Sequence, residues 1–242
     1  MARLLPRQQR AVDLLEPLLP GRHSGVNLDR HLYSSIIEPE QKDSKLMGRL
    51  MIAHKQYQDE FGAFSDMFGT YMEGQGMTSA GLGQFFTPED ICKMMVDLKL
   101  EDIQAAPARP SRVLDPCCGS GRFMLAVAEK YHRELKQYNF FITNVDLDFT
   151  AFVLCLFNAI LHAIPTVCIW GNSLSMDVFA AYATIQFYPM PYATFEKVDL
   201  GLAKKLLVGA LEETKTVEEK QDIPELCLVE NKLTIQQELF SA

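Results

Sequence analysis

Apolar side chains recur every three or four residues through the first part of the chain, which is the period of a helix that buries one face. This pattern predicts a helical region over residues 1–80, with a break near Gly62 or Gly69. Because the apolar stripe is long and aromatic, we expect it to form core and, in part, a docking surface for another subunit. Its members are Leu46, Leu50, the core histidine His54, Tyr57, Phe61, Phe64, Phe68 and Tyr71.

A loop that contains four glycines, over residues 74–83, separates this region from a different pattern. Thr87 followed by Pro88 is typical of a helix start, because threonine can cap free N–H groups and proline suits the first turn. The expected apolar face of this helix consists of Ile91, Met94, Met95 and Leu98.

From residue 111 onward, short apolar runs alternate with amphipathic stretches. Alternation of strands and helices predicts a parallel sheet covered by helices. The predicted strands are 112–114, 140–145, 166–170 and 184–188, with a final strand or hairpin over 226–235, and the predicted helices are 122–137, 150–163 and 198–220.

Composition narrows the class of protein. With 48% hydrophobic and 22% charged residues among 242, the chain has the composition of a globular protein rather than a disordered one. The net charge of −8 excludes a strongly basic nucleic-acid module, although it leaves room for a local basic patch. The six cysteines form no C-x-x-C pair. We therefore expect no metal site, and free thiols in a reducing compartment, the cytoplasm.

Targeting segments are not expected. The N-terminus lacks the apolar stretch and the cleavage site of a signal peptide. The most apolar stretch, residues 149–170, contains Asn158, His162 and Pro165. We therefore expect a buried helix and a strand there, and no membrane span.

The sharpest candidate for chemistry is the segment 115–123, D-P-C-C-G-S-G-R-F, between a predicted strand and a predicted helix. Gly119 and Gly121 allow a tight turn close to a ligand, and the helix start offers unpaired N–H groups. A dinucleotide-binding fingerprint would need a third glycine where this chain has Met124. Asp115 would repel a pyrophosphate but suits a cationic group such as an ammonium.

This segment resembles the S-adenosylmethionine loop of N6-adenine DNA methyltransferases, and most of all that of the modification subunits of type I restriction systems. Four further segments match in order. F-G-T-Y-M-E at 68–73 and G-Q-F-F-T-P at 83–88 precede the loop, Asp146 ends the second predicted strand, and G-N-S-L at 171–174 follows the third. The resemblance covers about residues 45–175.

The resemblance implies an α/β fold: a truncated, Rossmann-like methyltransferase sheet over residues 81–242, dependent on S-adenosyl-L-methionine, after the helical region 1–80. Asp146 would hold the cofactor ribose and Asn172 the adenine, although each is also a plausible turn residue. Cys117 and Cys118 are interpreted as small residues in a tight turn. The implied cofactor-binding residues are Phe85, Phe86, Thr87, Pro88, Asp115, Cys117, Gly119, Gly121, Phe123, Asp146 and Asn172.

The family's catalytic motif, Asn or Asp followed by Pro-Pro and Tyr or Phe, has no match in this chain. The nearest segment is Y-P-M-P-Y at 188–192, where Pro191 and Tyr192 keep the register and a proline replaces the polar first residue. In the family that polar residue accepts hydrogen from adenine N6, and the aromatic ring stacks on the flipped base. Tyr192 and Pro191 are therefore the catalytic candidates, with an irregular proline-rich loop as the alternative.

These features predict a site-specific adenine-N6 DNA methyltransferase of a restriction–modification or related mobile-element system. The chain shows no base-reading module in the roughly fifty residues after Tyr192, so we expect recognition of DNA to need a partner. That partner would be a specificity subunit or a second methyltransferase subunit, in a homo- or hetero-oligomer. Two alternatives stay open: a catalytically impaired cofactor-binding subunit that acts through a partner, and a methyltransferase for RNA or a small molecule.

Overall fold

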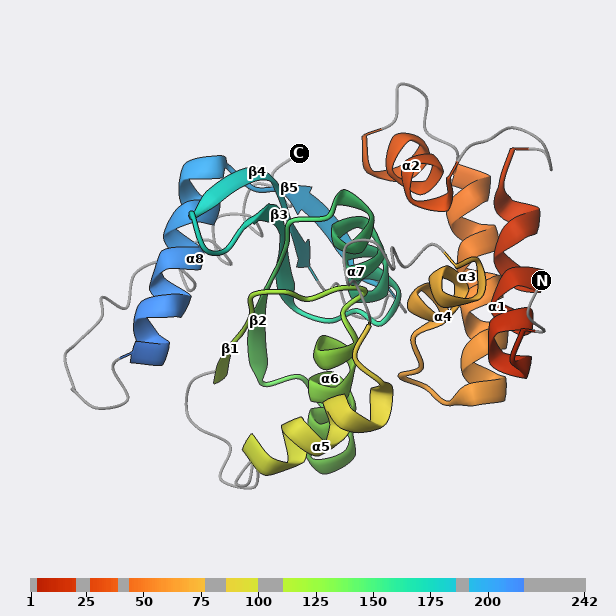
Figure 1. Cartoon of the computed structure of the whole chain (residues 1–242), viewed down its shortest axis with the longest axis horizontal. Coiled ribbons are helices and arrows are strands. Elements are labelled where there is room, and N and C mark those ends of the chain that lie inside the picture. Colours follow the sequence, from red (N-terminus) through yellow and green to blue (C-terminus); the bar gives the residue numbers. More distant parts are fainter. Residues whose placement is uncertain are drawn as a thin grey trace, which may run out of the picture. The chain divides into compact units, whose positions relative to one another are not determined.

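The computed structural model describes residues 4–20, 27–38, 44–76, 86–99, 111–185 and 192–215 (Figure 1). Residues Met1–Ala210 form one compact unit, and of the second unit, Leu211–Ala242, only the end of one helix is described. Among the described residues no helix is both long and apolar enough to cross a membrane.

The N-terminal region is helical, as predicted. Its long helix ends at Phe61, because Gly62 takes a positive φ of 109°, and Gly69 lies inside the next helix rather than at a break. The elements are α1 (Pro6–Leu15), the 3₁₀ turn η1 (Glu16–Leu18), α2 (Leu28–Leu32), the π turn η2 (Tyr33–Ile37), α3 (Ser44–Phe61) and α4 (Met67–Gly74).

The aromatic stripe of this region is core within the chain. Leu50, Tyr57 and Phe68 are fully buried, and His54 is buried as expected. Phe61 and Phe64 are partly buried against the same core. The structure thus uses the stripe to pack α1 against α3 and α4, and the expectation that part of it meets another subunit stays a prediction.

The α/β class is confirmed. Strands β1 (Ser111–Asp115), β2 (Phe140–Asp146) and β3 (Thr166–Asn172) are parallel. They are joined by α6 (Arg122–Leu135) and α7 (Phe149–Leu161), which lie on one side of the sheet in Figure 1. The sheet continues in the order β1-β2-β3-β4-β5, and α8 (Leu200–Lys215) follows it.

The parallel prediction is wrong for the second half of the sheet. Strand β4 (Asp177–Ile185) is antiparallel to β3 and starts seven residues before the predicted strand, and β5 (Thr194–Lys197) is antiparallel to β4. The reason is the short link 173–176, which allows a hairpin but not the crossover that a parallel pair needs. The predicted element over 226–235 lies outside the described residues.

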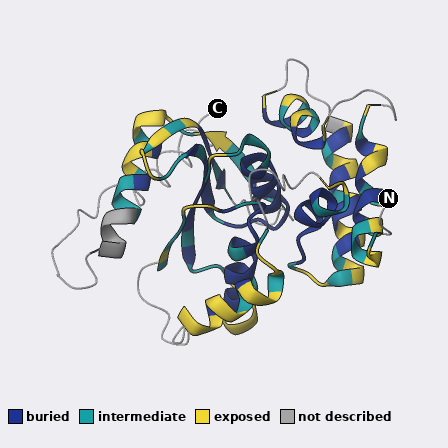
Figure 2. Cartoon of the chain, in the orientation of Figure 1, coloured by how far each residue is buried: buried dark blue, intermediate teal, exposed yellow. Residues whose placement is uncertain are grey.

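Helix α5 (Glu89–Lys99) begins just after Pro88, close to the predicted start, but it buries a different face. It packs on α6 through Cys92 and Val96, which are 3% and 1% exposed. Much of α5 is exposed (Figure 2), and the four residues expected to be buried are each more than 40% exposed: Ile91 at 42%, Met94 at 51%, Met95 at 45% and Leu98 at 65%.

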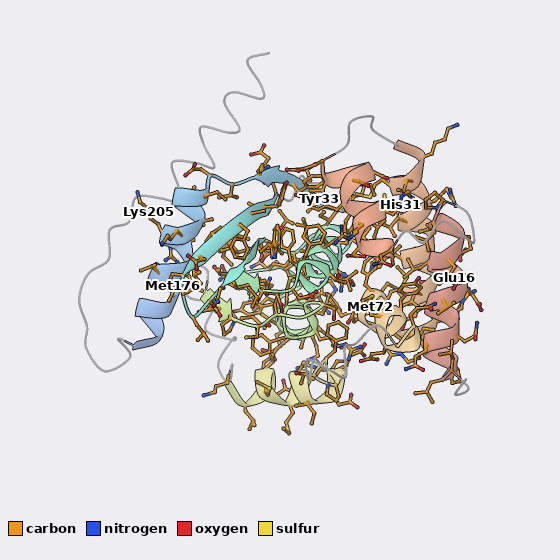
Figure 3. All side chains as sticks on the ribbon, turned by 45° about the horizontal axis from the view of Figure 1, so that its top comes forward. Glu16, His31, Tyr33, Met72, Met176 and Lys205 are labelled. Carbon is orange, nitrogen blue, oxygen red and sulfur yellow. The ribbon has the colours of Figure 1, made fainter. Side chains whose placement is uncertain are left out.

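Helix α7 joins the helical region to the sheet. Every residue from 151 to 161 is buried, because the helix packs on β2 and β3 and also on α2 and α4. In Figure 3, Tyr33 and Met72 lie on the side of the helical region that faces the sheet, whereas Glu16 lies on the far side. The two regions share one core, and the domain boundary predicted near residue 80 falls outside the described residues and stays a prediction.

Candidate functional site

Three predicted site residues end three neighbouring parallel strands. Asp115 ends β1, Asp146 ends β2 and Asn172 ends β3. Because the carboxyl ends of parallel strands meet at one edge of a sheet, all three lie at that edge, which we call the carboxyl edge. Ligands of open α/β sheets bind outside this edge.

The loop after β1 is anchored to the end of β2 by backbone hydrogen bonds. The N–H of Cys118 donates to the Val145 carbonyl at 2.9 Å, and the N–H of Gly119 donates to Oδ2 of Asp146 at 2.8 Å. The second bond gives Asp146 a structural task beside any contact with a ribose. The loop then turns into α6 at Gly121.

Both loop glycines are required by conformation and by space. Gly119 has a φ of 55° and Gly121 a φ of 90°, in the left-handed region that side chains rarely adopt. A Cβ at Gly119 would lie 2.9 Å from Cδ1 of Phe86, and one at Gly121 would lie 3.0 Å from Sγ of Cys155. The tight turn that the sequence predicted is therefore present, and the close approach of these glycines to a ligand stays a prediction.

A pocket of about 240 Å³ opens beside this loop. Its walls are the loop, the end of β1 and the first two turns of α5. The residues that line it are Phe86, Thr87, Cys92, Met95, Leu114, Asp115, Pro116, Cys117, Cys118, Gly119, Ser120, Arg122 and Phe123.

The pocket brings together part of the predicted cofactor set. Phe86, Thr87, Asp115, Cys117, Gly119 and Phe123 line it. Asp146 and Gly121 are not part of the lining: Asp146 accepts from the N–H of Gly119, and Gly121 packs against Cys155. Pro88 precedes α5 outside the lining, and Phe85 is outside the described residues.

Ionisation is disfavoured for two carboxylates at the carboxyl edge: Asp115, which lines the pocket, and Asp146, which binds the loop beside it. Burial raises the pKa of Asp115 to about 6; the N–H of Cys117 opposes this rise, and the charge of Asp146 adds to it. Burial also raises the pKa of Asp146 against hydrogen bonds from the N–H groups of Asp148 and Gly119. A cationic ligand group would relieve this arrangement.

Cys117 is not set up as a nucleophile. Burial raises the pKa of its thiol, and the charges of Asp146 and Asp115 raise it further. The thiol therefore stays protonated at neutral pH, in agreement with its interpretation as a small turn residue. The described cysteines, Cys92, Cys117, Cys118, Cys155 and Cys168, are all free thiols, and the described residues contain no cluster of metal-ligating side chains.

The side chain of Asn172 forms hydrogen bonds within the turn that follows β3. Its Oδ1 accepts hydrogen bonds from the N–H groups of Leu174 at 2.9 Å and Ser175 at 3.2 Å. This is an Asx turn that starts the β3–β4 hairpin. Its contact with adenine stays a prediction.

The structure does not bring Tyr192 to the loop. Strand β4 runs antiparallel to β3, away from the carboxyl edge, and Ala193, next to Tyr192, donates its N–H to the carbonyl of Ile160 near the end of α7. Tyr192 thus lies at the opposite edge of the sheet, across the 7 residues of β3, or roughly 20 Å. Pro191 lies outside the described residues. The reversal of β4 therefore removes geometric support from the catalytic assignment.

Sequence reasoning missed a buried ionic cluster next to the pocket. Arg122, 8% exposed, donates from Nε to Oδ2 of Asp66 at 2.9 Å and from Nη1 to Oε1 of Glu73 at 2.7 Å. Its guanidinium also lies 5.5 Å from the centre of the Phe86 ring. An arginine directly before the apolar run 123–128 was the available signal, but its partners are about fifty residues away in sequence.

The fold and site together define an α/β protein with a pocket at a glycine-rich strand–helix turn. The sequence model of the N-6 DNA methylase family matches residues 59–194, which is more than half of the chain. The chain therefore belongs to the N-6 DNA methylase family, as its motifs implied.

Two relatives and one solved structure were found to be similar. The methylase subunit of type I restriction enzyme MjaIX from Methanocaldococcus jannaschii is 28% identical over 128 residues, 52% of this chain and 20% of that protein. The type II methyltransferase M.MamI from Microbacterium ammoniaphilum is 32% identical over 74 residues, 28% of this chain and 20% of that protein. The matches thus span about a fifth of each relative's length.

The solved structure is a Listeria monocytogenes protein described as a class I S-adenosylmethionine-dependent methyltransferase. It matches with a TM-score of 0.41 and 15% identity, over 63% of this chain and 49% of that one.

Proposed function

We propose that this chain binds S-adenosylmethionine in the pocket beside residues 115–123 and serves the methylation of adenine N6 in DNA within a restriction–modification system. The observation that carries the proposal is the loop itself: Gly119 and Gly121 take left-handed conformations, Gly119 donates to Asp146, and the half-buried Asp115 lines the pocket beside them. Membership of the N-6 DNA methylase family supports the reaction class.

The residues of the pocket fit this cofactor. Burial raises the pKa of Asp115, and the ammonium of the methionine part would stabilise its ionised form. The oxygens of Asp146 have lone pairs beyond those used by Gly119 and Asp148, so they can accept from ribose hydroxyls. Phe86, Phe123 and Met95 provide apolar walls.

When bound, the cofactor would supply an electrophilic methyl group. Adenine N6 is a poor nucleophile because its lone pair is delocalised into the ring, so a preorganised acceptor for its hydrogens matters. Loss of one such polar contact typically costs roughly 10²–10³ in rate. None of the residues that line the pocket belongs to a segment with the family's catalytic motif, which is Asn or Asp followed by Pro-Pro and Tyr or Phe. Tyr192, the nearest candidate, lies at the opposite edge of the sheet.

The position of Tyr192 favours a second candidate: a cofactor-binding subunit whose acceptor and stacking groups come from elsewhere. A specificity subunit or a second methyltransferase subunit is the partner that we propose for target recognition, on the model of a type I methylase subunit. The free thiols of the described residues fit the proposed cytoplasmic location.

Two measurements separate these functions. Calorimetry with S-adenosylhomocysteine should give saturable binding to the chain alone, and absence of heat at millimolar ligand would remove the cofactor proposal. Transfer of tritiated methyl groups to DNA should be slow or absent for the chain alone and should appear when neighbouring gene products are added. Fast, sequence-specific methylation by the chain alone would contradict the need for a partner.

A further inference from the structure

Asp66 is a fully buried carboxylate at the junction of the helical region and the pocket loop. It is 0% exposed and caps α4 by accepting from the N–H of Gly69 at 2.8 Å. Its oxygens also accept from Oγ of Ser120 at 2.5 Å, Nε of Arg122 at 2.9 Å and Nδ2 of Asn158 at 2.9 Å. These donors come from α4, the loop, α6 and α7, so one side chain joins four segments.

Two of these contacts fix the loop on both sides of its last glycine. Ser120 precedes Gly121 and Arg122 follows it, and both bind Oδ2 of Asp66. Asn158 reinforces the same point, because its Nδ2 donates to the carbonyl of Ser120 at 2.8 Å. The left-handed turn at Gly121 is therefore held by side chains from outside the loop.

The same contacts reach the wall of the pocket. From Asp66, the guanidinium of Arg122 extends to the carbonyl of Thr87 at 3.3 Å and lies over the ring of Phe86. The N–H of Asp66 itself donates to Oε1 of Glu89, the first residue of α5, at 3.1 Å. Asp66 is thus linked to both the loop and the opposite wall.

The charges in this cluster depend on one another. Burial alone would lower the pKa of Arg122, but the carboxylates of Asp66 and Glu73 outweigh it and raise that pKa. Removal of one carboxylate leaves a buried cation short of a partner, which reorganises the surroundings. The nearest groups to reorganise are Ser120 and the loop.

The approach of α4 to the loop leaves no room for a side chain at Gly69. A Cβ there would lie 2.0 Å from Oδ2 of Asp66 and 2.6 Å from Oγ of Ser120. By contrast, nothing lies within 4 Å of a Cβ added at Gly48 in α3. The two glycines form a matched pair for an experiment.

We propose that Asp66 is a positioning residue for the cofactor loop, through which the packing of α4 and the occupancy of the pocket are thermodynamically coupled. The coupling to cofactor binding rests on the proposed function, whereas the positioning of the loop by Asp66 rests on the observed hydrogen bonds alone. By linkage, a cofactor that needs the ordered loop stabilises the contact with α4 to the same extent that α4 favours the cofactor.

The decisive variant is Asp66→Asn, compared with Leu50→Ala, which destabilises the helical core away from the loop. Amide hydrogen exchange on the ligand-free whole chain should become at least tenfold faster at residues 118–121 in Asp66→Asn. In Leu50→Ala the increase in the exchange rate at residues 118–121 should be no larger than the increase at the residues of β2. Equal effects of both variants on the loop would overturn the positioning role and leave Asp66 a structural residue.

Binding of S-adenosylhomocysteine gives the second readout. Asp66→Asn should weaken affinity at least tenfold, whereas Leu50→Ala should lower the melting temperature and leave affinity within about twofold. Unchanged affinity in Asp66→Asn would overturn the coupling. If wild-type protein does not bind this ligand, the proposed function fails, and the exchange experiment still decides the positioning of the loop.

Gly69→Ala tests the same contact without a change of charge, in case Asp66→Asn does not fold. It should weaken binding of S-adenosylhomocysteine at least fivefold and speed exchange at residues 118–121, whereas Gly48→Ala should do neither. Equal behaviour of the two alanine variants would contradict the proposal.

Discussion

The two edges of the sheet are built from different groups. At the carboxyl edge, a loop with two left-handed glycines borders a pocket, and the carboxylates of Asp115 and Asp146 are held there at a cost. At the opposite edge, polar groups are paired internally. Thr184 donates from Oγ1 to the Ile164 carbonyl, and Ala193 donates to the Ile160 carbonyl.

This difference indicates that the carboxyl edge is suited to ligand binding and that the opposite edge contributes to the stability of the fold. Unrelieved charge beside a cavity is typical of a site that awaits a ligand, whereas satisfied polar groups are typical of a structural edge. Tyr192 belongs to the second edge, although its sequence resembles part of a catalytic motif.

The largest expected effect is at the carboxyl edge. Gly119→Val should weaken S-adenosylhomocysteine binding more than about a hundredfold. The reason is that valine does not tolerate a φ of 55° and its side chain would collide with Phe86. Calorimetry measures this effect, and circular dichroism checks that the fold is kept. Binding within tenfold of wild type would break the comparison.

Asp115→Asn should weaken the same binding by about thirtyfold, because the ligand's ammonium loses a buried charged partner worth about 2 kcal/mol. In the ligand-free protein, Asp115→Asn should instead be favourable, because it should stabilise the fold. The folded state raises the pKa of Asp115 to about 6, so the native state holds the proton more tightly than the unfolded state. Ionisation of Asp115 therefore lowers the free energy of unfolding as pH rises from about 4 through 6.

Thermal melts at pH 7 would measure that second effect, and Asp115→Asn should melt higher than wild type. A variant that melts lower while binding normally would show that Asp115 is structural. Asp177→Asn, at an exposed acid in the same edge, serves as the control and should change neither quantity.

The opposite edge should show a pH effect on folding whose sign is opposite to that of Asp115. His54 and His162 are buried with Nε2 atoms 3.3 Å apart, and burial lowers their pKa values to about 2 and about 4. Nδ1 of His162 lies 2.8 Å from the Asn158 carbonyl, so it carries the proton, and its Nε2 accepts from His54.

Because the folded state depresses both pKa values, stability is present above the unfolded pKa of 6.5 and is lost as pH falls. Between pH 7 and pH 5 the free energy of unfolding should fall by about 2 kcal/mol for each histidine. Urea denaturation at the two pH values tests this, and His54→Leu should reduce the pH dependence by about half. A pH-independent free energy in wild type would contradict the neutral pair.

The smallest expected effect is that of Tyr192→Ala, which should change S-adenosylhomocysteine affinity by less than about twofold. The side chain lies across the sheet from the pocket, so only its local packing is lost. Calorimetry beside Gly119→Val would sharpen the comparison. A tenfold loss for Tyr192→Ala would mean that the two edges communicate.

Much of the architecture was predictable from local patterns. The boundaries of β1, β2, β3, α6 and α7 agree with the apolar runs to within about two residues, since period and turn residues act over short distances. The loop 115–123 was predictable for the same reason: Gly119 and Gly121 are demanded by the backbone at those positions.

Other features depended on packing between distant segments. The face of α5 was assigned to its largest apolar residues, yet the helix buries Cys92 and Val96, because the approach to α6 selects the face. Tyr57 and Phe68 of the aromatic stripe are fully buried within the chain, where α1 packs against α3 and α4.

By itself, the sequence determined the family, the half-sheet from β1 to β3 and the glycine loop, because each is written in contiguous residues whose conformations are local. Only the tertiary structure decided the direction of β4, which carries Tyr192 to the far edge, and the role of Asp66, whose partners Ser120 and Asn158 lie 54 and 92 residues away. Strand direction and buried ion pairing depend on which distant surfaces meet, and that free energy belongs to the whole packed core rather than to any segment.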